Sequence, residues 1–208
     1  EGLDTYVEQA HGAETRLLKV EENGVRFEVP LEGGQKTGWF YDHRMNRQRL
    51  QAYAPGKRVL DVFAYAGGWG LQALAAGADS LTAIDASNAA LSVLLRNAEQ
   101  HGVADRVQAL HGNAFELMQQ LLDEGERFDV VVIDPPAFIK RRKDFKTGLK
   151  AYRKLNTLAM RLLQREGLLV SASCSMHLPD AELIDAVRSA SRHVDRNAQL
   201  VFQGKQGP

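Results

Sequence analysis

The chain has 208 residues, enough for one full α/β domain with a proper core but too few for two large domains. Its 26 lysines and arginines balance 26 aspartates and glutamates, so no global charge draws it to nucleic acid or membrane, and any basic surface must be local. The single cysteine excludes an intramolecular disulfide within these residues, and from their pattern we expect neither a leader nor a membrane span. We therefore expect a cytoplasmic protein without membrane contact, and the start at Glu1 without methionine favours a fragment of a longer chain.

Residues 1–32 predict a small N-terminal β-hairpin extension. In the stretch "LLKVEENGVRFEVPL", two alternating runs flank Asn23-Gly24, the strongest short-range signal for a hairpin turn. A loop that begins with two glycines follows, and an arginine-rich helix is expected at about residues 42–53. The rest of the chain, residues 33–208, reads as one domain.

From residue 56 onwards, short β-branched runs alternate with longer helical patterns, and glycine, proline or capping residues mark the changes of period. This alternation predicts an α/β fold of the doubly wound, Rossmann-like type, with a mostly parallel sheet covered on both faces by helices. The expected strands are 58–63, 80–85, 106–111, 128–134, 167–173 and 198–202, and the helices between them begin near Gly68, Ser87, Ala114, Thr147 and Pro179.

A nucleotide-type cofactor is expected at the carboxyl ends of the strands, where open parallel sheets bind their ligands. The first of these strands leads into "AYAGGWG", and Asp85 ends the second strand, 18 residues after Gly67, about where an acid meets ribose hydroxyls. A glycine turn followed by an acid serves dinucleotides as well as S-adenosylmethionine. Asp61 favours the methyl donor, because a carboxylate at that strand end can meet the ammonium of a methionine moiety.

The fourth strand ends in "DPPAF", a stiff corner with fixed φ angles that carries an acid and a nearby aromatic ring. Asp134 can bind a base edge there, and Phe138 can stack on a base. The fifth strand ends just before Cys174. Neighbouring strands lie about 4.8 Å apart, so Asp134 and Cys174 are expected to converge on one volume.

A basic run follows the corner directly. Its position beside the expected base pocket favours phosphate contact over a plain solvated surface for Lys140, Arg141, Arg142 and Lys143. Arg47 and Arg49 extend this track or lie on a solvated helix face; the sequence leaves both open. The six histidines have no metal-ligand spacing, so no metal is expected.

With these motifs in hand, the chain resembles class I S-adenosylmethionine-dependent ribosomal RNA methyltransferases, in particular the 23S rRNA cytosine-C5 group. The resemblance spans nearly the whole chain and rests on "GGQKTGWFYDHRMNR", "VLDVFAYAGGWG", "AIDAS", "GNAF", "DPPAF" and "SCS", in the family's order. It implies a cytosine-C5 methyltransferase with S-adenosylmethionine as cofactor, S-adenosylhomocysteine as product and ribosomal RNA as partner.

The resemblance also implies which residues hold the cofactor. The donor loop and the residues after it would close over the cofactor, the first strand's end would line its methionine part, Asp85 would hold the ribose, and Asn113 and Ala114 would lie beside the adenine. The family more often has an aspartate at position 113. The other positions are Lys36, Thr37, Gly38, Asp42, Arg44, Asp61, Phe63, Gly67 and Gly68.

Cys174 would then be the nucleophile. Carbon 5 of cytosine is too weak a nucleophile to take a methyl group directly, whereas addition of a thiolate to carbon 6 makes it an enamine carbon. Asp134 would hydrogen-bond the N3 and N4 edge of the base, with Pro135, Pro136 and Phe138 also lining the base site. Many RNA cytosine-C5 enzymes carry a second cysteine beside the fourth-strand proline, but here Pro136 follows Pro135, so the base that removes the C5 proton stays unassigned.

The family pattern extends beyond this chain. Its members usually carry an N-terminal RNA-binding PUA domain, which we expect outside this segment, and a final antiparallel strand that the sequence does not supply before residue 208. The sequence leaves open whether the protein is a monomer or a homodimer. It also leaves the target nucleotide open.

Three rival functions remain at this point. A nitrogen methyltransferase acting on a guanine or adenine of rRNA would use the same Asp-Pro-Pro corner without needing Cys174. A nicotinamide-dependent oxidoreductase would share the glycine turn. A non-catalytic RNA-binding protein would keep the fold and transfer no methyl group.

Overall fold

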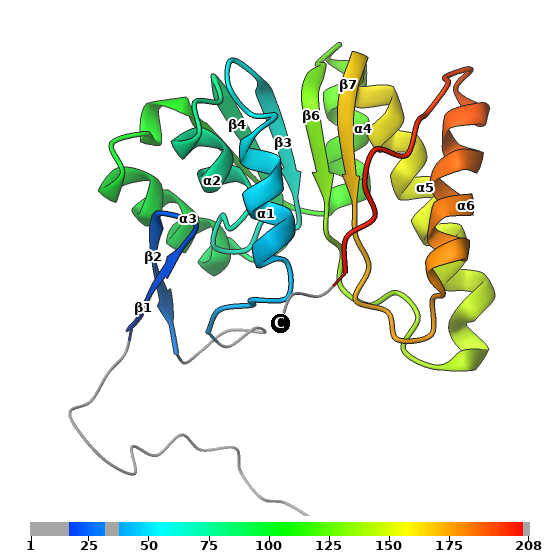
Figure 1. Ribbon diagram of the computed structural model, residues 1–208, viewed down its shortest axis with the longest axis horizontal. Coiled ribbons are helices and arrows are strands. Elements are labelled where there is room, and N and C mark those ends of the chain that lie inside the picture. The colour runs from blue at the N-terminus through cyan, green and yellow to red at the C-terminus, as the bar shows by residue number, and fades with distance from the viewer. Residues whose placement is uncertain (1–16, 32–37, 206–208) are drawn as a thin grey trace, which may run out of the picture.

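The computed structural model describes residues 17–31 and 38–205. Its centre is a parallel five-stranded sheet with the strand order β5-β4-β3-β6-β7, so the first strand of the sheet lies in the middle and the chain winds outward in both directions (Figure 1). The strands are β3 (Arg58–Val62), β4 (Ser80–Asp85), β5 (Val107–His111), β6 (Phe128–Ile133) and β7 (Leu163–Ser171). The doubly wound α/β prediction is confirmed, and the switch point lies between β3 and β6.

Helices cover both faces of the sheet because its strands are apolar on both sides. Alternate residues of β3 divide between two cores: Val59 packs with α1, α2 and α3, whereas Leu60 and Val62 pack with α4 and α5. Helix α6 packs on α5 rather than on the sheet, through Ala186 and Tyr152. The helices are α1 (Arg44–Gln51), α2 (Gly70–Ala75), α3 (Asn88–Gln100), α4 (Ala114–Asp123), α5 (Phe145–Leu162) and α6 (Asp180–His193), with short 3-10 turns η1 (Ala104–Arg106) and η2 (Arg142–Asp144).

The expected hairpin is present as β1 (Leu17–Glu22) and β2 (Val25–Pro30). Its turn residues Asn23 and Gly24 both have positive φ, 52° and 80°, which the tight turn of a two-residue hairpin requires. Phe27 of β2 is almost fully buried in the same core as α2 and α3. The hairpin is therefore fixed to the sheet domain by shared apolar packing.

The prediction of a strand at residues 198–202 is wrong. This segment is apolar enough for a strand, but a strand needs a ladder partner, and within residues 17–31 and 38–205 it pairs with none. It runs instead along the front of the molecule towards α1 (Figure 1). The Arg49 guanidinium lies 3.8 Å from the centre of the Phe202 ring, and Gln203 donates a hydrogen bond to Asp180 at the start of α6.

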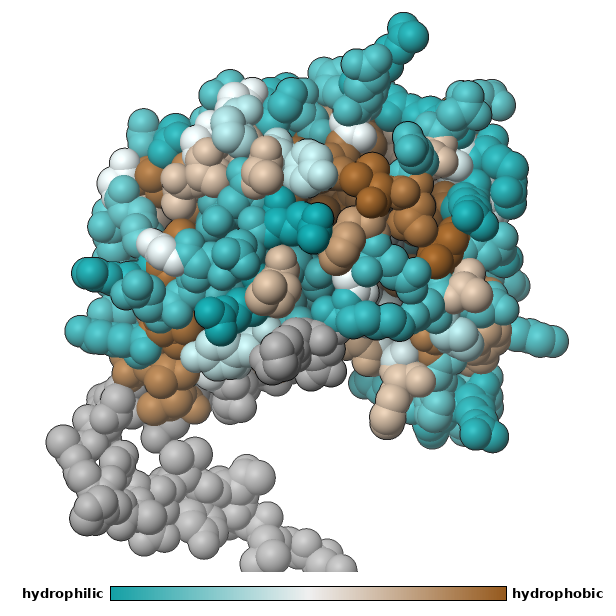
Figure 2. Space-filling model, in the orientation of Figure 1, coloured by the Kyte–Doolittle hydropathy of each residue, from teal (hydrophilic) through white to brown (hydrophobic). Residues whose placement is uncertain are grey.

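Strand β7 forms one edge of the sheet, and the chain enters it through an irregularity. Phe128 pairs with Leu163, but Val130 pairs with Leu168, so β7 carries extra residues at that point. Residues 167–171 are all half-buried. Apolar side chains gather on the visible face where the segment 198–202, with exposed Leu200, Val201 and Phe202, crosses in front of β7, and hydrophilic surface covers most of the rest (Figures 1 and 2). Among the helices of the described ranges, none is long and apolar enough to cross a membrane.

Candidate active site at the carboxyl edge of the sheet

Asp61 is fully buried in β3 and accepts a hydrogen bond through Oδ2 from the backbone N–H of Gly70, at 2.9 Å. Its other oxygen, Oδ1, has no hydrogen-bond partner. Burial, which the Gly70 bond opposes only in part, raises the pKa of Asp61 to about 7. A buried acceptor without a partner is costly, so this carboxyl group is suited to a cationic ligand atom that would restore its charge.

The turn after β3 is held in an unusual backbone shape. Phe63, Tyr65 and Gly67 all have positive φ, at 68°, 49° and 87°, and the turn leads directly into α2. A side chain at Gly67 would also collide with Leu71, only 2.8 Å from the position of a Cβ atom. Non-glycine residues with positive φ cluster at functional sites, so the strained turn points to a ligand site at this edge.

Asp85 ends β4 and uses both carboxylate oxygens in backbone bonds. Oδ2 accepts from the N–H of Tyr65 and Oδ1 from the N–H of Ser87, at 2.9 and 2.8 Å. Asn113 is exposed and caps α4, because its Oδ1 accepts from the N–H groups of Phe115 and Glu116. These bonds fix the two side chains at the carboxyl edge of the sheet, where the sequence motifs predict ribose and adenine.

The donor loop is described only from Gly38 onwards; Lys36 and Thr37 lie outside the described residues. Gly38 has a φ of 72°, and its carbonyl accepts a hydrogen bond from the hydroxyl of Tyr65, which ties the loop to the turn after β3. Asp42 is half-buried, and Arg44 is exposed at the start of α1. The loop thus returns to the carboxyl edge.

Asp134, at the end of β6, is bound by two side chains that the sequence analysis did not single out. Its Oδ2 accepts a hydrogen bond from Trp69 Nε1 at 3.1 Å, and its Oδ1 lies 3.6 Å from His43 Nε2. About a quarter of the Asp134 side chain stays exposed. His43 and Asp134 are far apart in the chain, so no spacing signalled their pairing, although His43 lies within the donor-loop motif.

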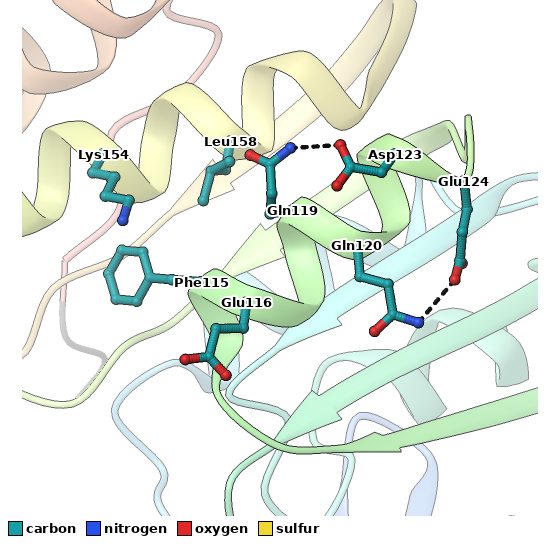
Figure 3. Close-up of a pocket in the computed structure, with 8 residues that line it drawn as sticks. All are labelled: Phe115, Glu116, Gln119, Gln120, Asp123, Glu124, Lys154 and Leu158. Carbon is teal, nitrogen blue, oxygen red and sulfur yellow. Dashed lines mark hydrogen bonds between the residues drawn. The ribbon is translucent and has the colours of Figure 1, made fainter.

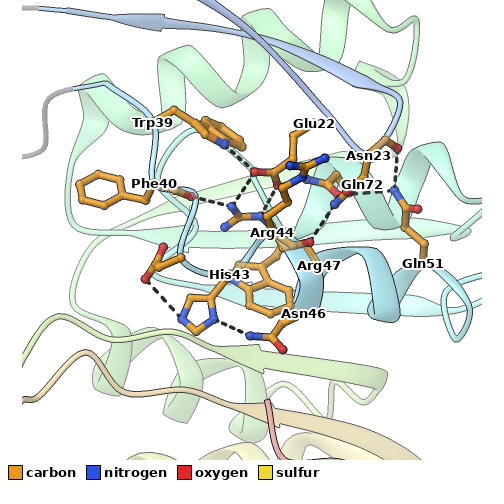
Figure 4. Close-up of polar contacts among 12 residues, drawn as sticks. Glu22, Asn23, Trp39, Phe40, His43, Arg44, Asn46, Arg47, Gln51 and Gln72 are labelled. Atoms are coloured by element: carbon orange, nitrogen blue, oxygen red, sulfur yellow. Dashed lines mark hydrogen bonds and ion pairs between the residues drawn. The ribbon is translucent and has the colours of Figure 1, made fainter. Parts of the chain in front are cut away.

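The pKa of His43 is raised above its ordinary value. Burial alone would lower it, but the Asp134 carboxylate beside Nε2, helped by the charge of Asp42, outweighs both burial and the nearby Arg47. His43 Nε2 lies 3.8 Å from the Asp42 carboxylate, and Nδ1 is 3.1 Å from the side-chain amide nitrogen of Asn46 (Figure 4). Protonated His43 is therefore held between two carboxylates.

Cys174 lies beside the same corner, as the sequence analysis predicted for the ends of β6 and β7. The residue is exposed, and its Sγ is 3.6 Å from the carbonyl oxygen of Pro135. The flanking serines are anchored from below: the hydroxyl of Tyr152 bonds Ser173 Oγ at 2.7 Å and Ser175 Oγ at 2.9 Å. The thiol is thus presented to solvent on a turn that is itself held firmly.

The rest of the corner divides into packed and exposed parts. Pro135 is buried, Pro136 is exposed, and Phe138 is half-buried. The Phe138 ring packs among those of Phe63, Phe115 and Tyr152, with centroid distances of 5.0 to 6.4 Å. All four cationic side chains that follow are exposed, at Lys140, Arg141, Arg142 and Lys143, and Arg141 pairs with Asp144 at 3.1 Å.

Arg47 does not belong to an exposed basic track. It is 5 % exposed and forms a buried ion pair with Glu22 of the hairpin, with Nε to Oε1 at 2.6 Å and Nη2 to Oε2 at 3.0 Å. Trp39 and Gln72 also donate to Glu22 (Figure 4). Burial alone would raise the pKa of Glu22, but these bonds and the Arg47 charge outweigh it and hold the pKa below its usual value. Glu22 lies next to the hairpin turn, and its bonds with Arg47 hold α1 against the hairpin.

A shallow pocket away from this edge is lined by side chains along α4 and α5, among them Phe115 of α4 and Leu158 of α5 (Figure 3). Four of its polar side chains bond in pairs, Gln119 with Asp123 and Gln120 with Glu124. Within the part of the chain that the structure describes, no three His, Cys, Asp or Glu side chains cluster as a metal site would require.

A parallel sheet of this order, with a glycine turn and a buried acid at its carboxyl edge, defines a Rossmann-like domain of the kind that binds nucleotide cofactors. The family model described as S-adenosylmethionine-dependent methyltransferase matches residues 3–198. The chain belongs to this family. The turn after β3 fits the cofactor, because buried Asp61 Oδ1 has no partner of its own.

Curated relatives resemble the chain over nearly all of its length. It is 36 % identical over 203 residues to "Ribosomal RNA large subunit methyltransferase I" of Aeromonas salmonicida, covering 97 % of this chain and 51 % of the relative. The protein of that name from Photobacterium profundum is 34 % identical, with the same coverage. The chain thus spans about half the length of these relatives.

Solved structures agree on the fold. The crystal structure of the methyltransferase-like protein SMU.776, complexed with SAH, superposes with a TM-score of 0.77 at 25 % identity over 87 % of this chain and 48 % of that one. Trm5b from Pyrococcus abyssi has a TM-score of 0.65 at 17 % identity, over 91 % of this chain and 53 % of its own. That second likeness concerns the fold alone.

Proposed function

We propose that this chain is the catalytic part of an enzyme that methylates C5 of a cytosine in large-subunit ribosomal RNA, through a covalent adduct with Cys174. The observation that carries the proposal is the exposed thiol of Cys174 next to the Asp134–Pro135 corner, with Sγ 3.6 Å from the Pro135 carbonyl. Covalent catalysis at C6 needs an accessible cysteine beside a group that can bind the base edge. The names of the curated relatives supply the class of RNA.

The cofactor site is proposed at the turn after β3. Asp61 would bind the ammonium group of S-adenosylmethionine, with Phe63, Gly67 and Gly68 lining the methionine part. Asp85 would bind the ribose, Asn113 and Ala114 would border the adenine, and Lys36, Thr37, Gly38, Asp42 and Arg44 would close over the molecule. When bound, S-adenosylmethionine supplies an electrophilic methyl group on a sulfonium.

The base would bind at the carboxyl ends of β6 and β7. Cys174 as a thiolate forms a bond to C6, and the displaced π electrons make C5 an enamine carbon that can attack the methyl group. Asp134 is a quarter exposed and held by Trp69, so it can present one carboxylate edge to N3 and N4. Pro136 and Phe138 would border the base.

The RNA backbone would lie over the loop that precedes α5. Lys140, Arg142 and Lys143 are exposed there, a few residues after the Asp134–Pro135 corner, and Arg141 forms an ion pair with Asp144. Phosphate contact at this loop would be salt-dependent, since it releases counterions. The neutral net charge of the chain is compatible with a local contact of this kind.

The test is a map of modified nucleotides in ribosomal RNA from cells that lack the protein. Loss of one 5-methylcytosine, restored by the wild-type gene and not by Cys174→Ala, is expected. Loss of a methylated guanine or adenine instead, restored equally by Cys174→Ala, would replace the proposal with a nitrogen methyltransferase. An unchanged map would contradict both.

A further inference from the structure

The pair formed by His43 and Asp134 has no role in the chemistry described so far. His43 comes from the segment just before α1, and Asp134 comes from the end of β6, so tertiary folding alone brings Nε2 to 3.6 Å from Oδ1. The His43 side chain is only 16 % exposed, and the Trp69 ring lies 5.4 Å from its ring. A mostly buried imidazole therefore lies beside the carboxylate that is proposed to bind the base, and this position suggests a role in the reaction.

We propose that His43 is a positioning residue that acts through Asp134: it holds the proton that Asp134 lends to N3 of the cytosine when Cys174 adds to C6. The inference rests on the proposed function. Addition of the thiolate forms the S–C6 bond and pushes a π pair through C4 onto N3. N3 must then gain a proton, or the adduct carries the full negative charge.

The proton can travel along the pair without any outside reagent. Once the base is bound and the 3.6 Å between Nε2 and Oδ1 has shortened to hydrogen-bond distance, the proton leaves His43 Nε2 for the Asp134 carboxylate, which passes it on to N3 and is a carboxylate again. His43 becomes neutral as the adduct becomes neutral. After C5 has taken the methyl group and the sulfonium carbon–sulfur bond has broken, N3 carries a positive charge and becomes acidic. The proton then returns through Asp134 to His43. A solvent water takes the C5 proton, and the C5–H electron pair forms the C5=C6 bond as the S–C6 bond breaks and the thiolate leaves.

The surroundings of His43 suit a group that changes its charge. Asp42 and Asp134 face Nε2 from two different elements, whereas Arg47 is the cation that opposes protonation. Asn46 contacts Nδ1 at 3.1 Å, and a side-chain amide can offer either its NH2 to a neutral ring or its oxygen to a protonated one. Both protonation states therefore find partners.

The same groups favour the protonated ring in the resting protein. The Asp134 and Asp42 charges outweigh burial and raise the pKa of His43 above its ordinary value. A proton held in this way is present at low pH and is lost as the pH rises through the raised pKa. The methyl-transfer rate should therefore have an alkaline limb that belongs to His43.

The experiment measures single-turnover methylation of a cytosine-containing rRNA fragment against pH for wild type, His43→Gln and Trp69→Phe. Glutamine can donate one hydrogen bond to Asp134 but cannot titrate, so we expect a rate about 10²-fold slower, the lower end of what a positioned proton transfer contributes, with no alkaline limb. Trp69→Phe removes the other donor to Asp134 and should slow the reaction while keeping that limb. An unchanged limb in His43→Gln would overturn the inference.

A second readout does not depend on activity. NMR titration of the His43 ring should give a pKa that falls in Asp134→Asn, because the opposing carboxylate is gone, and an unchanged pKa would overturn the inference. Failure of the proposed function is recognised separately: Cys174→Ala would then still methylate C5, whatever His43 does.

Discussion

The carboxyl edge of the sheet has two sides of opposite character. On the side of β3 and α1, polar groups are buried and interlocked: Glu22 and Arg47 are 2 % and 5 % exposed, and Asp61 is fully buried. On the side of β6 and β7, Cys174 and the cations from Lys140 to Lys143 are exposed. This difference in exposure separates the groups proposed to bind the cofactor from the groups proposed to meet the RNA.

A fixed small molecule favours a site that is already built, because preorganised groups lose little entropy on binding. A large RNA must instead reach its groups from outside, so the nucleophile and phosphate-binding side chains need to project. His43 and Asp134 join the two sides, since one comes from the donor loop and the other from the base corner. Variants on the exposed side should therefore affect catalysis and RNA binding, whereas variants on the buried side should affect stability and cofactor binding.

The largest effect is expected on the exposed side. Cys174→Ala should reduce methyl transfer by on the order of 10³-fold or more, because the alternative route leaves C5 unactivated. The free energy of unfolding should change little, since the thiol is exposed. Radiolabel transfer to rRNA together with urea unfolding checks both halves. Full methylation activity in this variant would contradict the covalent role proposed for Cys174.

On the interlocked side, Arg47→Met should destabilise the protein by about 3–5 kcal/mol, because it leaves the buried Glu22 carboxylate without its cation. The matched control is the double variant Glu22→Gln/Arg47→Met, which removes both charges and should cost clearly less than the sum of the single variants. Urea unfolding at pH 7 measures all of them. Strict additivity would mean that the buried pair is not coupled.

Asp61 should make the ligand-free protein less stable as the pH rises. Its pKa is about 7 in the fold against an ordinary 3.8, so between these values the folded state binds more protons than the unfolded state, and stability falls with rising pH. Asp61→Asn should flatten this dependence and raise ligand-free stability at pH 8 by about 1–3 kcal/mol. Calorimetric affinity for S-adenosylhomocysteine should fall at the same time. A tighter complex in Asp61→Asn would contradict the ammonium role.

The smallest effect is expected for the basic loop. Replacing Lys140, Arg142 and Lys143 with glutamine should weaken RNA binding and reduce the slope of log affinity against log salt by about 0.7 for each phosphate that the loop no longer neutralises. Lys57→Gln, an exposed cation before β3 at the opposite edge of the sheet, is the control and should leave the slope unchanged. Equal effects from both variants would mean that the loop has no special place in RNA binding.

Much of the fold followed from local signals. Asn23-Gly24 predicted the hairpin turn because both residues accept positive φ, and the β-branched runs gave β3 and β4 their bounds within a residue. The meeting of Cys174 with the Asp134–Pro135 corner followed from the rule that strand ends share one edge. The prediction of a strand at 198–202 was wrong because the residue pattern of a segment does not show whether a neighbouring strand is available to pair with it.

Long-range polar partners were the part that the sequence did not reveal. Nothing near Arg47 indicates that its partner is Glu22, 25 residues earlier, and an arginine on a helix is usually exposed. His43 and Trp69 each meet Asp134 only after the sheet has formed. Such pairs depend on tertiary geometry, which residue spacing in a single sequence does not encode.

The central claim is the covalent step at Cys174, and the most direct test is a trapping experiment with an rRNA fragment that carries 5-fluorocytosine. Once C5 is methylated, fluorine cannot leave as a proton does, so the enzyme should remain attached to C6. We predict that mass spectrometry finds a protein–RNA adduct at Cys174 that forms only with S-adenosylmethionine and is absent in Cys174→Ala. Active methylation of the unmodified fragment with no adduct on the fluorinated one would contradict the account.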